Sequence, residues 1–350
     1  MSDMPIHDKE LTKLLRKRNE KATCPNKRDE LLRAIEAFSK IDKCSPNAFQ
    51  RVYLNGDEML SLKIDGHLIT WRIFPYIPAF PADPYHFMKD NEDTEVVVSL
   101  AGSEYSYVLY WVSQKEAMKH LMERTIKFKT TTETLEVVNR VTDFLESQHL
   151  KANRLNALRL DAAETEKCLA RLVDSSSIQE MRLYAAPENM RLFQWRDIRY
   201  CKKLFIVFPV DSEAPEQLFF RQLQNEQLEI NYYNMREKDM AELIKNWIQN
   251  HRPIGTKFCY SVDSGKEASE MLDSIRMETE GFCSSYWPKH AGQSEESRCQ
   301  MHTSTTTIPM DSERELLLFG KRNSPEEFKK RRFQWSVHMQ IVKAGTTKPE

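Results

Sequence analysis

The sequence predicts an α+β protein in which a small antiparallel β-meander is followed by an irregular leucine-rich-repeat-like strand–helix solenoid and a C-terminal β-hairpin. Hydrophobic residues recur with a period of two through residues 49–112. An apolar-x-apolar pattern then recurs at nearly constant spacing across residues 126–275. The expected parts are a charged N-terminal helical segment (1–47), the meander (48–112), the repeats (113–279), a mobile loop (280–311) and the hairpin with its tail (312–350), with a turn at Gly320.

The meander is predicted from alternating strands that are separated by turn dipeptides. Two runs of alternating apolar residues flank Asp65-Gly66, and a type I′ turn favours this dipeptide because both of its central residues need positive φ. Asn55-Gly56 follows an earlier strand in the same way. Residues 95–100 and 105–111 give a further strand pair, so about five antiparallel strands are expected. Residues 113–124 then form a helix, with Ala117, Leu121 and Met122 on its apolar side.

The repeats are predicted from five apolar pairs at intervals of 23, 23, 24 and 30 residues: Leu158/Leu160, Met181/Leu183, Leu204/Ile206, Leu228/Ile230 and Phe258/Tyr260. Ile126/Phe128 is a candidate for an outlying first copy. A helix-start signal follows each of the five pairs. The capping boxes are Asp161-x-x-Glu164, Asn234-x-x-Glu237 and Ser264-x-x-Glu267, and the remaining helices begin at Pro187 and Pro215.

The residue between the two members of each pair is expected to face outward along a parallel sheet. This outward row consists of Arg159, Arg182, Phe205, Glu229 and Cys259. Phe205 is expected to be an exposed apolar residue among charges. Because the strand face of a solenoid is a common site of protein recognition, the row is our candidate partner surface. The alternative is that the C-terminal strands cover this face and give it a structural role only.

No motif in the sequence predicts an enzyme or a cofactor. A phosphate-binding loop, a Gly-x-Gly-x-x-Gly fingerprint and a Gly-x-Ser-x-Gly elbow are all absent from the sequence. Cys283, His290, Cys299 and His302 are residue types that bind zinc, but their spacing matches no common structural zinc pattern. We therefore expect no catalytic, cofactor or metal site, although sequence alone leaves metal binding by these four residues open.

Charge and cysteine usage predict an intracellular protein, cytoplasmic rather than nuclear. The 51 basic and 52 acidic residues nearly cancel, so no overall field attracts nucleic acid or a membrane surface. The seven cysteines form no Cys-x-x-Cys motif, and the first 25 residues lack the apolar core of a signal peptide. The basic residues 329–332 are expected to be a solvated charged run, with a nuclear-import signal or a phosphate contact as the alternatives. The oligomeric state stays open.

Three short sequence segments resemble a known family: Gln194-Trp195-Arg196-Asp197, the stretch from Lys238-Asp239-Met240 to Asn246-Trp247-Ile248, and the stretch from Ile308-Pro309-Met310 to Phe319. Together with the element order over residues 49–342, they resemble the F-box-associated (FTH-like) proteins of nematodes. This resemblance implies a protein-recognition domain that selects substrates. It also implies an N-terminal F-box that binds a Skp-type adaptor of a cullin-RING ubiquitin ligase.

The sequence departs from this family in its N-terminal segment. An F-box usually opens with Leu-Pro, and this dipeptide occurs nowhere in the chain, while the expected helices at 9–18 and 29–39 are short and charged. The expected function is a non-enzymatic protein-recognition module that acts as a substrate receptor in ubiquitination, with an unknown substrate. The alternatives are a divergent enzyme with a site assembled from loops, or a family relic without ligase activity.

Overall fold

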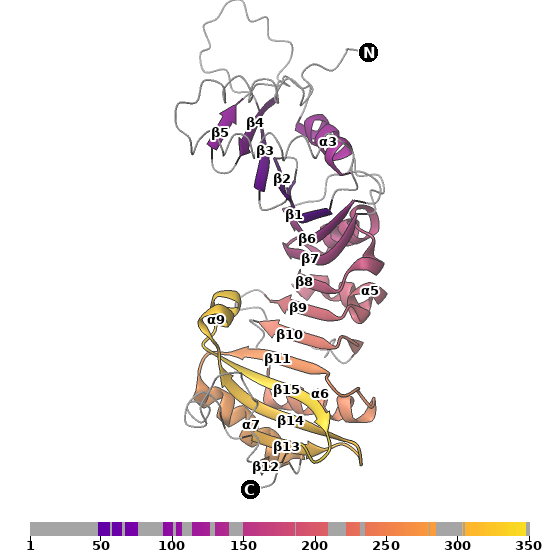
Figure 1. Cartoon of the computed structure of the whole chain (residues 1–350). Helices are drawn as coiled ribbons and strands as arrows, with labels where there is room; N and C mark the ends of the chain where they lie inside the picture. Colours follow the sequence, from indigo (N-terminus) through magenta and orange to yellow (C-terminus); the bar gives the residue numbers. More distant parts are fainter. Residues whose placement is uncertain are drawn as a thin grey trace, which may run out of the picture. The chain divides into compact units, whose positions relative to one another are not determined.

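The protein is a mixed α/β chain that divides into two compact units, Met1–Ile178 (unit 1) and Gln179–Glu350 (unit 2) (Figure 1). The structure is a computed structural model. It describes residues 48–75 without 57, 65 and 66, then 94–100, 103–106, 114–126, 130–139, 150–208 without 186, 222–231, 235–279, 281–284, 303 and 305–347. The expected N-terminal segment 1–47 lies outside these residues. Each unit is built on β-strands that run side by side.

Unit 1 holds strands in the order β7-β6-β1-β2-β3-β4-β5. Their bounds are β1 (Ala48–Asn55), β2 (Met59–Ile64), β3 (His67–Pro75), β4 (Thr94–Leu100), β5 (Ser103–Ser106), β6 (Thr131–Val138) and β7 (Lys151–Arg159). Strands β1 to β5 pair antiparallel, which confirms the predicted meander, and β1, β6 and β7 pair parallel. Gly56 has φ +49°, as a turn after Asn55 requires, whereas Asp65-Gly66 lies outside the described residues.

The helices of unit 1 cover apolar residues, as the sequence predicts. They are α3 (Gln114–Thr125), α4 (Ala162–Lys167), the π-helical turn η1 (Cys168–Leu172) and the 3₁₀ turn η2 (Ser175–Ser177). Ala117, Leu121 and Met122 are all buried. The Asp161 side chain accepts a hydrogen bond from the Glu164 N–H at 2.8 Å, so the predicted start of α4 is confirmed.

Two apolar pairs assigned to unit 1 do not form the expected strand positions. Ile126 is buried directly after α3, where its N–H bonds to the Met122 carbonyl, and the nearby strand begins only at Thr131. In β7 the inward residues are Leu155 and Ala157, whereas Leu158 is half-buried. The pairing of β6 with β7 shifts register between Glu136 and Val138. Such an irregularity changes which side chains of a strand point inward.

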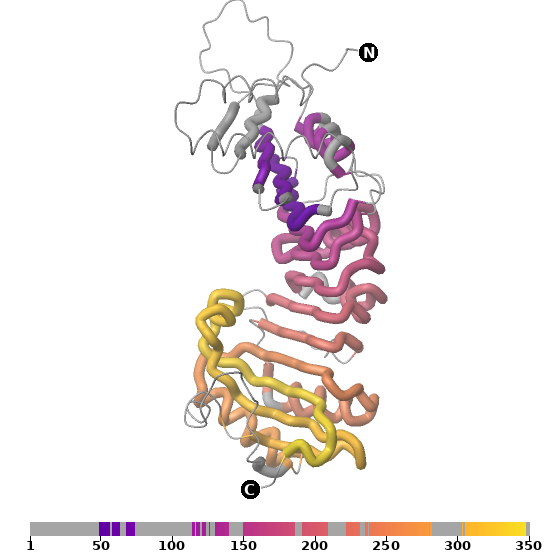
Figure 2. The backbone as a smooth tube through the Cα atoms, viewed as in Figure 1, coloured from indigo at the N-terminus to yellow at the C-terminus, as the bar shows by residue number. Residues whose placement is uncertain are grey.

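Unit 2 holds strands in the order β8-β9-β10-β11-β15-β14-β13-β12. Their bounds are β8 (Glu180–Tyr184), β9 (Lys203–Val207), β10 (Gln227–Asn231), β11 (Lys257–Val262), β12 (Phe282–Ser284), β13 (Thr305–Pro309), β14 (Arg314–Arg322) and β15 (Trp335–Lys343). The first four strands pair parallel, and all later neighbours pair antiparallel. Figure 2 shows this path as successive strands of the backbone tube.

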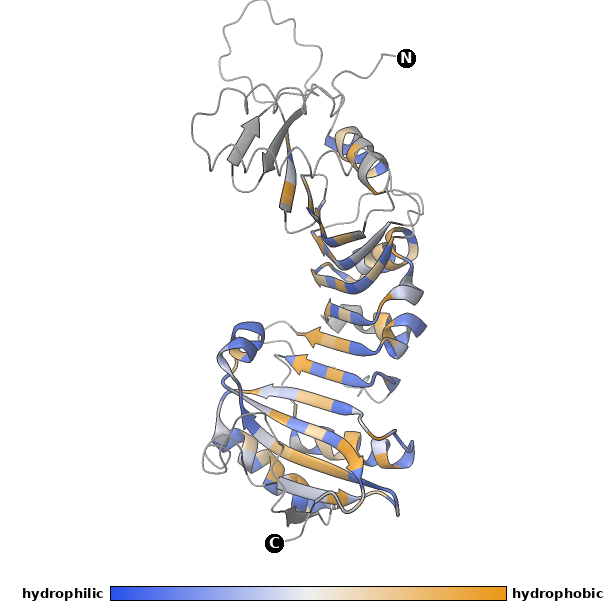
Figure 3. Cartoon of the chain, in the orientation of Figure 1, coloured by the Kyte–Doolittle hydropathy of each residue, from blue (hydrophilic) through white to orange (hydrophobic). Residues whose placement is uncertain are grey.

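The inward face of unit 2 confirms the four apolar pairs from Met181/Leu183 to Phe258/Tyr260, because all eight side chains are buried. In Figure 3 blue and orange alternate along β10, whereas β9 is blue at its start and orange toward its end. The helices are the 3₁₀ helix η3 (Pro187–Gln194), α5 (Arg196–Tyr200), α6 (Glu237–Gln249), α7 (Gly265–Thr279) and α9 (Pro325–Arg331). Trp247 of α6 is buried, whereas Trp195, the residue before α5, is half-buried.

The helix starts of unit 2 follow two of the predicted signals. Pro187 opens η3, and the Ser264 hydroxyl accepts a hydrogen bond from the Glu267 N–H at 3.1 Å before α7. The predicted capping box at Asn234 is wrong, because the N-cap of α6 is Arg236, two residues later. Helix α6 begins after Arg236, whose N–H donates to the Asp239 carboxylate at 3.2 Å. Asn234 and Pro215 themselves lie outside the described residues.

The C-terminal region differs from expectation in three places. The segment expected as a mobile loop contains β12 and β13, and Thr305 to Thr307 are buried, since β-branched residues suit a pleated strand. Gly320 lies within β14 rather than at a turn. The basic run at 329–332 lies in α9 and at its end, where Lys329, Lys330 and Arg332 are exposed as predicted, whereas Arg331 is buried. Strands β14 and β15 do pair antiparallel, but α9 lies between them in sequence.

Candidate functional site

Four of the five residues predicted to face outward lie side by side on unit 2. The strand registers align Arg182 with Phe205, Phe205 with Glu229, and Glu229 with Cys259. The same row continues through His338 of β15 and Phe319 of β14. Arg159, the fifth residue, is exposed at the end of β7 in unit 1. The outward row therefore exists across β8 to β11 and extends onto strands that the repeats do not include.

Phe205 is not the exposed apolar residue that the sequence predicts. Its exposed fraction is 5%, because the Arg182 guanidinium lies 4.6 Å and the Lys330 ammonium 5.1 Å from its ring centroid. Both cations interact favourably with the ring face. Cys259 is also covered, with an exposed fraction of 8%. Lys330 and Arg331 of α9 contact Phe205 and Glu229 of the row, whereas the C-terminal strands β15 and β14 continue the row within the sheet instead of covering it.

The position of α9 is fixed at both of its ends. The Ser324 hydroxyl accepts from the Glu327 N–H at 3.2 Å, and the Glu327 carboxylate accepts from the Ser324 N–H at 2.9 Å, which makes a capping box followed by proline. Arg332 ends the helix in the left-handed region, at φ +68°. The text Ser324-Pro325-Glu326-Glu327 is thus a local signal for this helix that the sequence prediction missed.

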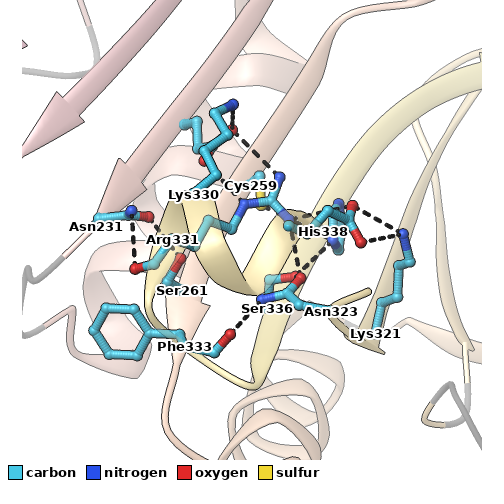
Figure 4. Close-up of polar contacts among 12 residues, drawn as sticks. Asn231, Cys259, Ser261, Lys321, Asn323, Lys330, Arg331, Phe333, Ser336 and His338 are labelled. Atoms are coloured by element: carbon cyan, nitrogen blue, oxygen red, sulfur yellow. Dashed lines mark hydrogen bonds and ion pairs between the residues drawn. The ribbon is translucent and has the colours of Figure 1, made fainter. Parts of the chain in front are cut away.

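Two basic residues of α9, Lys330 and Arg331 (both labelled in Figure 4), bind the Glu229 carboxylate of the outward row. Arg331 Nε lies 2.9 Å from Glu229 Oε1, and Lys330 Nζ lies 3.1 Å from Glu229 Oε2. Burial alone would raise the pKa of Glu229, but the hydrogen bonds and charges of Arg331 and Lys330 outweigh it and hold that pKa below its ordinary value. Glu229, Lys330 and Arg331 therefore form one ion-pair cluster, in which Glu229 and Arg331 are largely buried and Lys330 is exposed.

Asn323, Ser336 and His338 form further hydrogen bonds that hold the Arg331 side chain in place. The Asn323 side-chain oxygen accepts from Arg331 Nη1 at 2.9 Å and from the Ser336 hydroxyl at 2.8 Å. Because the Ser336 proton points to Asn323, the Ser336 oxygen accepts from His338 Nε2 at 2.8 Å, which sets the tautomer of that ring. Figure 4 shows these side chains converging on one point between α9 and β15. Polar networks that are satisfied in this way rigidify a structure.

A groove of about 530 Å³ lies beside this cluster on the outward face of unit 2. Its lining includes Phe205, Glu229, Cys259 and His338 of the outward row. It also includes a parallel line of polar side chains, which we call the polar row: Lys203, Gln227, Lys257 and Gln340. With Lys321, Lys330 and Arg331 also lining it, the groove has five basic residues against the two acids Glu180 and Glu229. It therefore favours an acidic ligand.

The thiol in the groove is not activated for nucleophilic chemistry. Burial is the largest cause that raises the pKa of Cys259, to about 12, although its sulfur lies 3.9 Å from His338 Nε2. A nucleophilic cysteine reacts as the thiolate, which this pKa disfavours at neutral pH. Within the described residues no group of three or more His, Cys, Asp or Glu side chains is placed to hold a metal ion. Cys283 lies in β12, while His290, Cys299 and His302 lie outside those residues.

Comparison with known proteins gives one match. The family model of a domain of unknown function, DUF3557, matches residues 113–264. This range includes Arg182, Phe205, Glu229 and Cys259 but ends before α9 and its basic residues. Neither the curated proteins nor the solved structures give a match to the chain. In the part of the chain that the structure describes, no helix has both the length and the apolar character of a membrane span.

Proposed function

We propose that unit 2 is a non-enzymatic protein-recognition module and that its groove receives a segment of a partner protein. The observation that carries this proposal is the groove of about 530 Å³ lined by two rows of side chains in register. The lysine and glutamine side chains that line it offer ammonium and amide groups that can fix the orientation of a bound chain. Lys203 and Lys257 are exposed, so a partner can reach them.

The wider role that we propose is that of a substrate receptor in a cullin-RING ubiquitin ligase, acting inside the cell. The resemblance of the three sequence segments to F-box-associated proteins supports this role. We propose an irregular leucine-rich-repeat-like solenoid as the scaffold, and the parallel strands β8 to β11 with their four buried apolar pairs support it. Affinity purification at native expression levels tests the ligase role. Recovery of a Skp-type adaptor with a cullin is expected, and its repeated absence would contradict the role.

The recognition role itself is tested by cross-linking from inside the groove. A photoreactive amino acid replaces Gln227 or Gln340, whose side chains line the groove, and a matched variant carries it at Lys245 on the exposed side of α6. A protein adduct is expected from both groove positions and not from position 245. Equal labelling from all three positions, or none from the groove, would overturn the recognition role.

The alternative function is that of an enzyme, and the observation that favours it is the proximity of Cys259 to His338 within the groove. Alkylation separates the two functions, because a catalytic thiol reacts quickly at neutral pH and a buried thiol of high pKa does not. With iodoacetamide at pH 7.5, site-resolved mass spectrometry is expected to find Cys259 unmodified in the native protein and modified after unfolding in urea. Rapid native labelling of Cys259, with buried Cys168 and Cys201 unlabelled, would instead favour the enzyme.

A further inference from the structure

The polar row is a line of four side chains on neighbouring strands. The strand registers align Lys203 of β9 with Gln227 of β10, Gln227 with Lys257 of β11, and Lys257 with Gln340 of β15. Because neighbouring strands lie about 4.8 Å apart, the row extends over roughly 14 Å, and its two lysine Cα atoms stand roughly 10 Å apart. The row therefore offers donors along a line rather than at one point.

The two lysines of this row are the basic residues lining the groove that have no ion-pair partner among the described residues, whereas Lys321, Lys330 and Arg331 share the carboxylates of Glu229 and Glu327. Lys330 and Arg331 are paired with Glu229, and Lys321 Nζ lies 3.0 Å from Glu327. The remaining acid, Glu180, lies beside Lys203 in register but is at ion-pair distance from Arg182, at 4.0 Å. Lys203 and Lys257 form no ion pair or side-chain hydrogen bond with the residues that the structure describes.

We infer that the groove binds an acidic peptide segment in extended conformation, whose carboxylates lie over Lys203 and Lys257 and accept hydrogen bonds from the Gln227 and Gln340 amides. This inference rests on the proposed recognition role and specifies its partner. Side chains on one face of an extended peptide repeat at roughly 6.7 Å. Two flexible lysine side chains, whose Cα atoms are roughly 10 Å apart, can reach acids two residues apart on such a chain.

The geometry favours peptide carboxylates over a single phosphate group. A phosphate site commonly uses the arginine fork, which matches the oxygens of the anion bidentately. The arginine that lines this groove, Arg331, already directs two of its nitrogens at Glu229 and a third at Asn323. What remains for a ligand is a line of ammonium and amide donors, and this matches carboxylates that are spread along a chain.

The test measures binding of a defined peptide to the full chain by fluorescence anisotropy. The probe is a fluorescein-labelled decapeptide with Glu at every second position, and its neutral counterpart carries Gln at the same positions. The K203E/K257E variant is expected to bind the Glu peptide at least tenfold more weakly than the wild type, and K203Q/K257Q to lose binding in the same direction by a smaller factor. The control K238E/K245E, which changes two exposed lysines of α6, is expected to stay within twofold.

Circular dichroism and urea denaturation of each variant establish that it is folded before binding is compared. Equal affinity for the Glu and Gln peptides would overturn the inference, as would an equal loss in K238E/K245E. Complete competition by millimolar inorganic phosphate would also overturn it, because it indicates a phosphate site. A cross-linked partner at Gln227 that lacks acidic segments would refute the acidic ligand and retain the recognition role, whereas the absence of any groove adduct refutes that role itself.

Discussion

Arg331 is the residue on which the contact between α9 and the sheet depends most. Its side chain is 8% exposed and that of its partner Glu229 is 14% exposed, so both charges are largely removed from water. Removing one partner of a buried ion pair leaves the other charge uncompensated, which typically costs about 3–5 kcal/mol. We expect R331M to lower the free energy of unfolding by about that amount, as measured by urea denaturation at pH 7.

Two further variants show whether this loss comes from the buried charge. K329M removes an exposed positive charge from the same helix and is expected to change the unfolding free energy by less than about 0.5 kcal/mol. The double variant E229Q/R331M removes both charges and is expected to recover part of the loss of R331M. If R331M costs no more than K329M, the ion pair does not hold α9 on the sheet.

At the scale of one element, the N-terminal cap of α9 should make its stability depend on pH. Burial would raise the pKa of Glu327, but the Ser324 N–H and the Lys321 ammonium outweigh it and hold that pKa at about 2, below the ordinary 4.5. A carboxylate with a depressed pKa stabilises the folded state above the ordinary pKa, and this contribution is lost as pH falls through the lowered value. E327Q removes the ionised partner at every pH.

We therefore expect wild type to exceed E327Q in unfolding free energy by about 1–2 kcal/mol at pH 7. The difference should persist down to about pH 4.5 and then shrink between pH 4.5 and 2, as the carboxyl of the wild type becomes protonated. Urea denaturation across this range provides the measurement. E326Q, which changes an exposed acid beside it, is the control and should lie within about 0.5 kcal/mol of the wild type at pH 7. A gap that stays constant to pH 2 would argue against the capping role of Glu327.

Strand β14 depends on a glycine where it packs against α7. A Cβ atom added to Gly320 would lie 2.8 Å from Thr303 Cγ2 and 3.0 Å from Ala268 Cβ, both closer than atoms in normal contact. Overpacking of this kind typically costs about 1–3 kcal/mol, and we expect G320A to lose that much unfolding free energy. The same substitution in a T303S background, which removes Cγ2, should cost less. Equal losses in the two backgrounds would contradict this explanation.

The elements that the sequence predicts well are those whose evidence is local. The apolar pairs from Met181 to Tyr260 identify β8 to β11, because a strand buried on one face must alternate and a helix-start signal must follow. The predicted turn at Gly320 is wrong. A glycine is needed there because Ala268 and Thr303 leave no room for a Cβ atom, and the sequence around Gly320 does not reveal these neighbours. Thr305 to Thr307 were read as loop because a polar composition outweighed their β-branched side chains.

At the scale of the whole molecule, the candidate site combines what the sequence predicts with what only the fold reveals. The outward row was readable because its members occupy equivalent positions in successive repeats. The contact of α9 with this row could not be predicted from the sequence, because Glu229 and Arg331 are separated by 102 residues and no local pattern connects them. When Glu229 is not known as a partner, the sequence of the basic run 329–332 predicts a solvated surface for all four residues, although Arg331 is buried. The groove arises where these two parts of the chain meet on unit 2.

The distribution of charge over the chain determines how a ligand should respond to salt. The formal net charge is −1, so attraction of an acidic peptide must come from the groove itself and act over a short range. Exposed charges are screened progressively as the Debye length falls from roughly 10 Å at 0.1 M to roughly 3 Å at 1 M salt. We expect the affinity for the Glu peptide to fall about five- to tenfold between 0.05 and 0.5 M NaCl.

Lys203 and Lys257 are the groups expected to cause most of this salt dependence, because the other basic residues of the groove form ion pairs with Glu229 or Glu327. The residual binding of K203Q/K257Q should therefore change by less than twofold over the same salt range, whereas K238E/K245E should follow the wild type. Anisotropy titrations at four salt concentrations measure all three proteins. Wild-type affinity that is insensitive to salt would mean that apolar contacts dominate, and the two lysines would then not select the ligand.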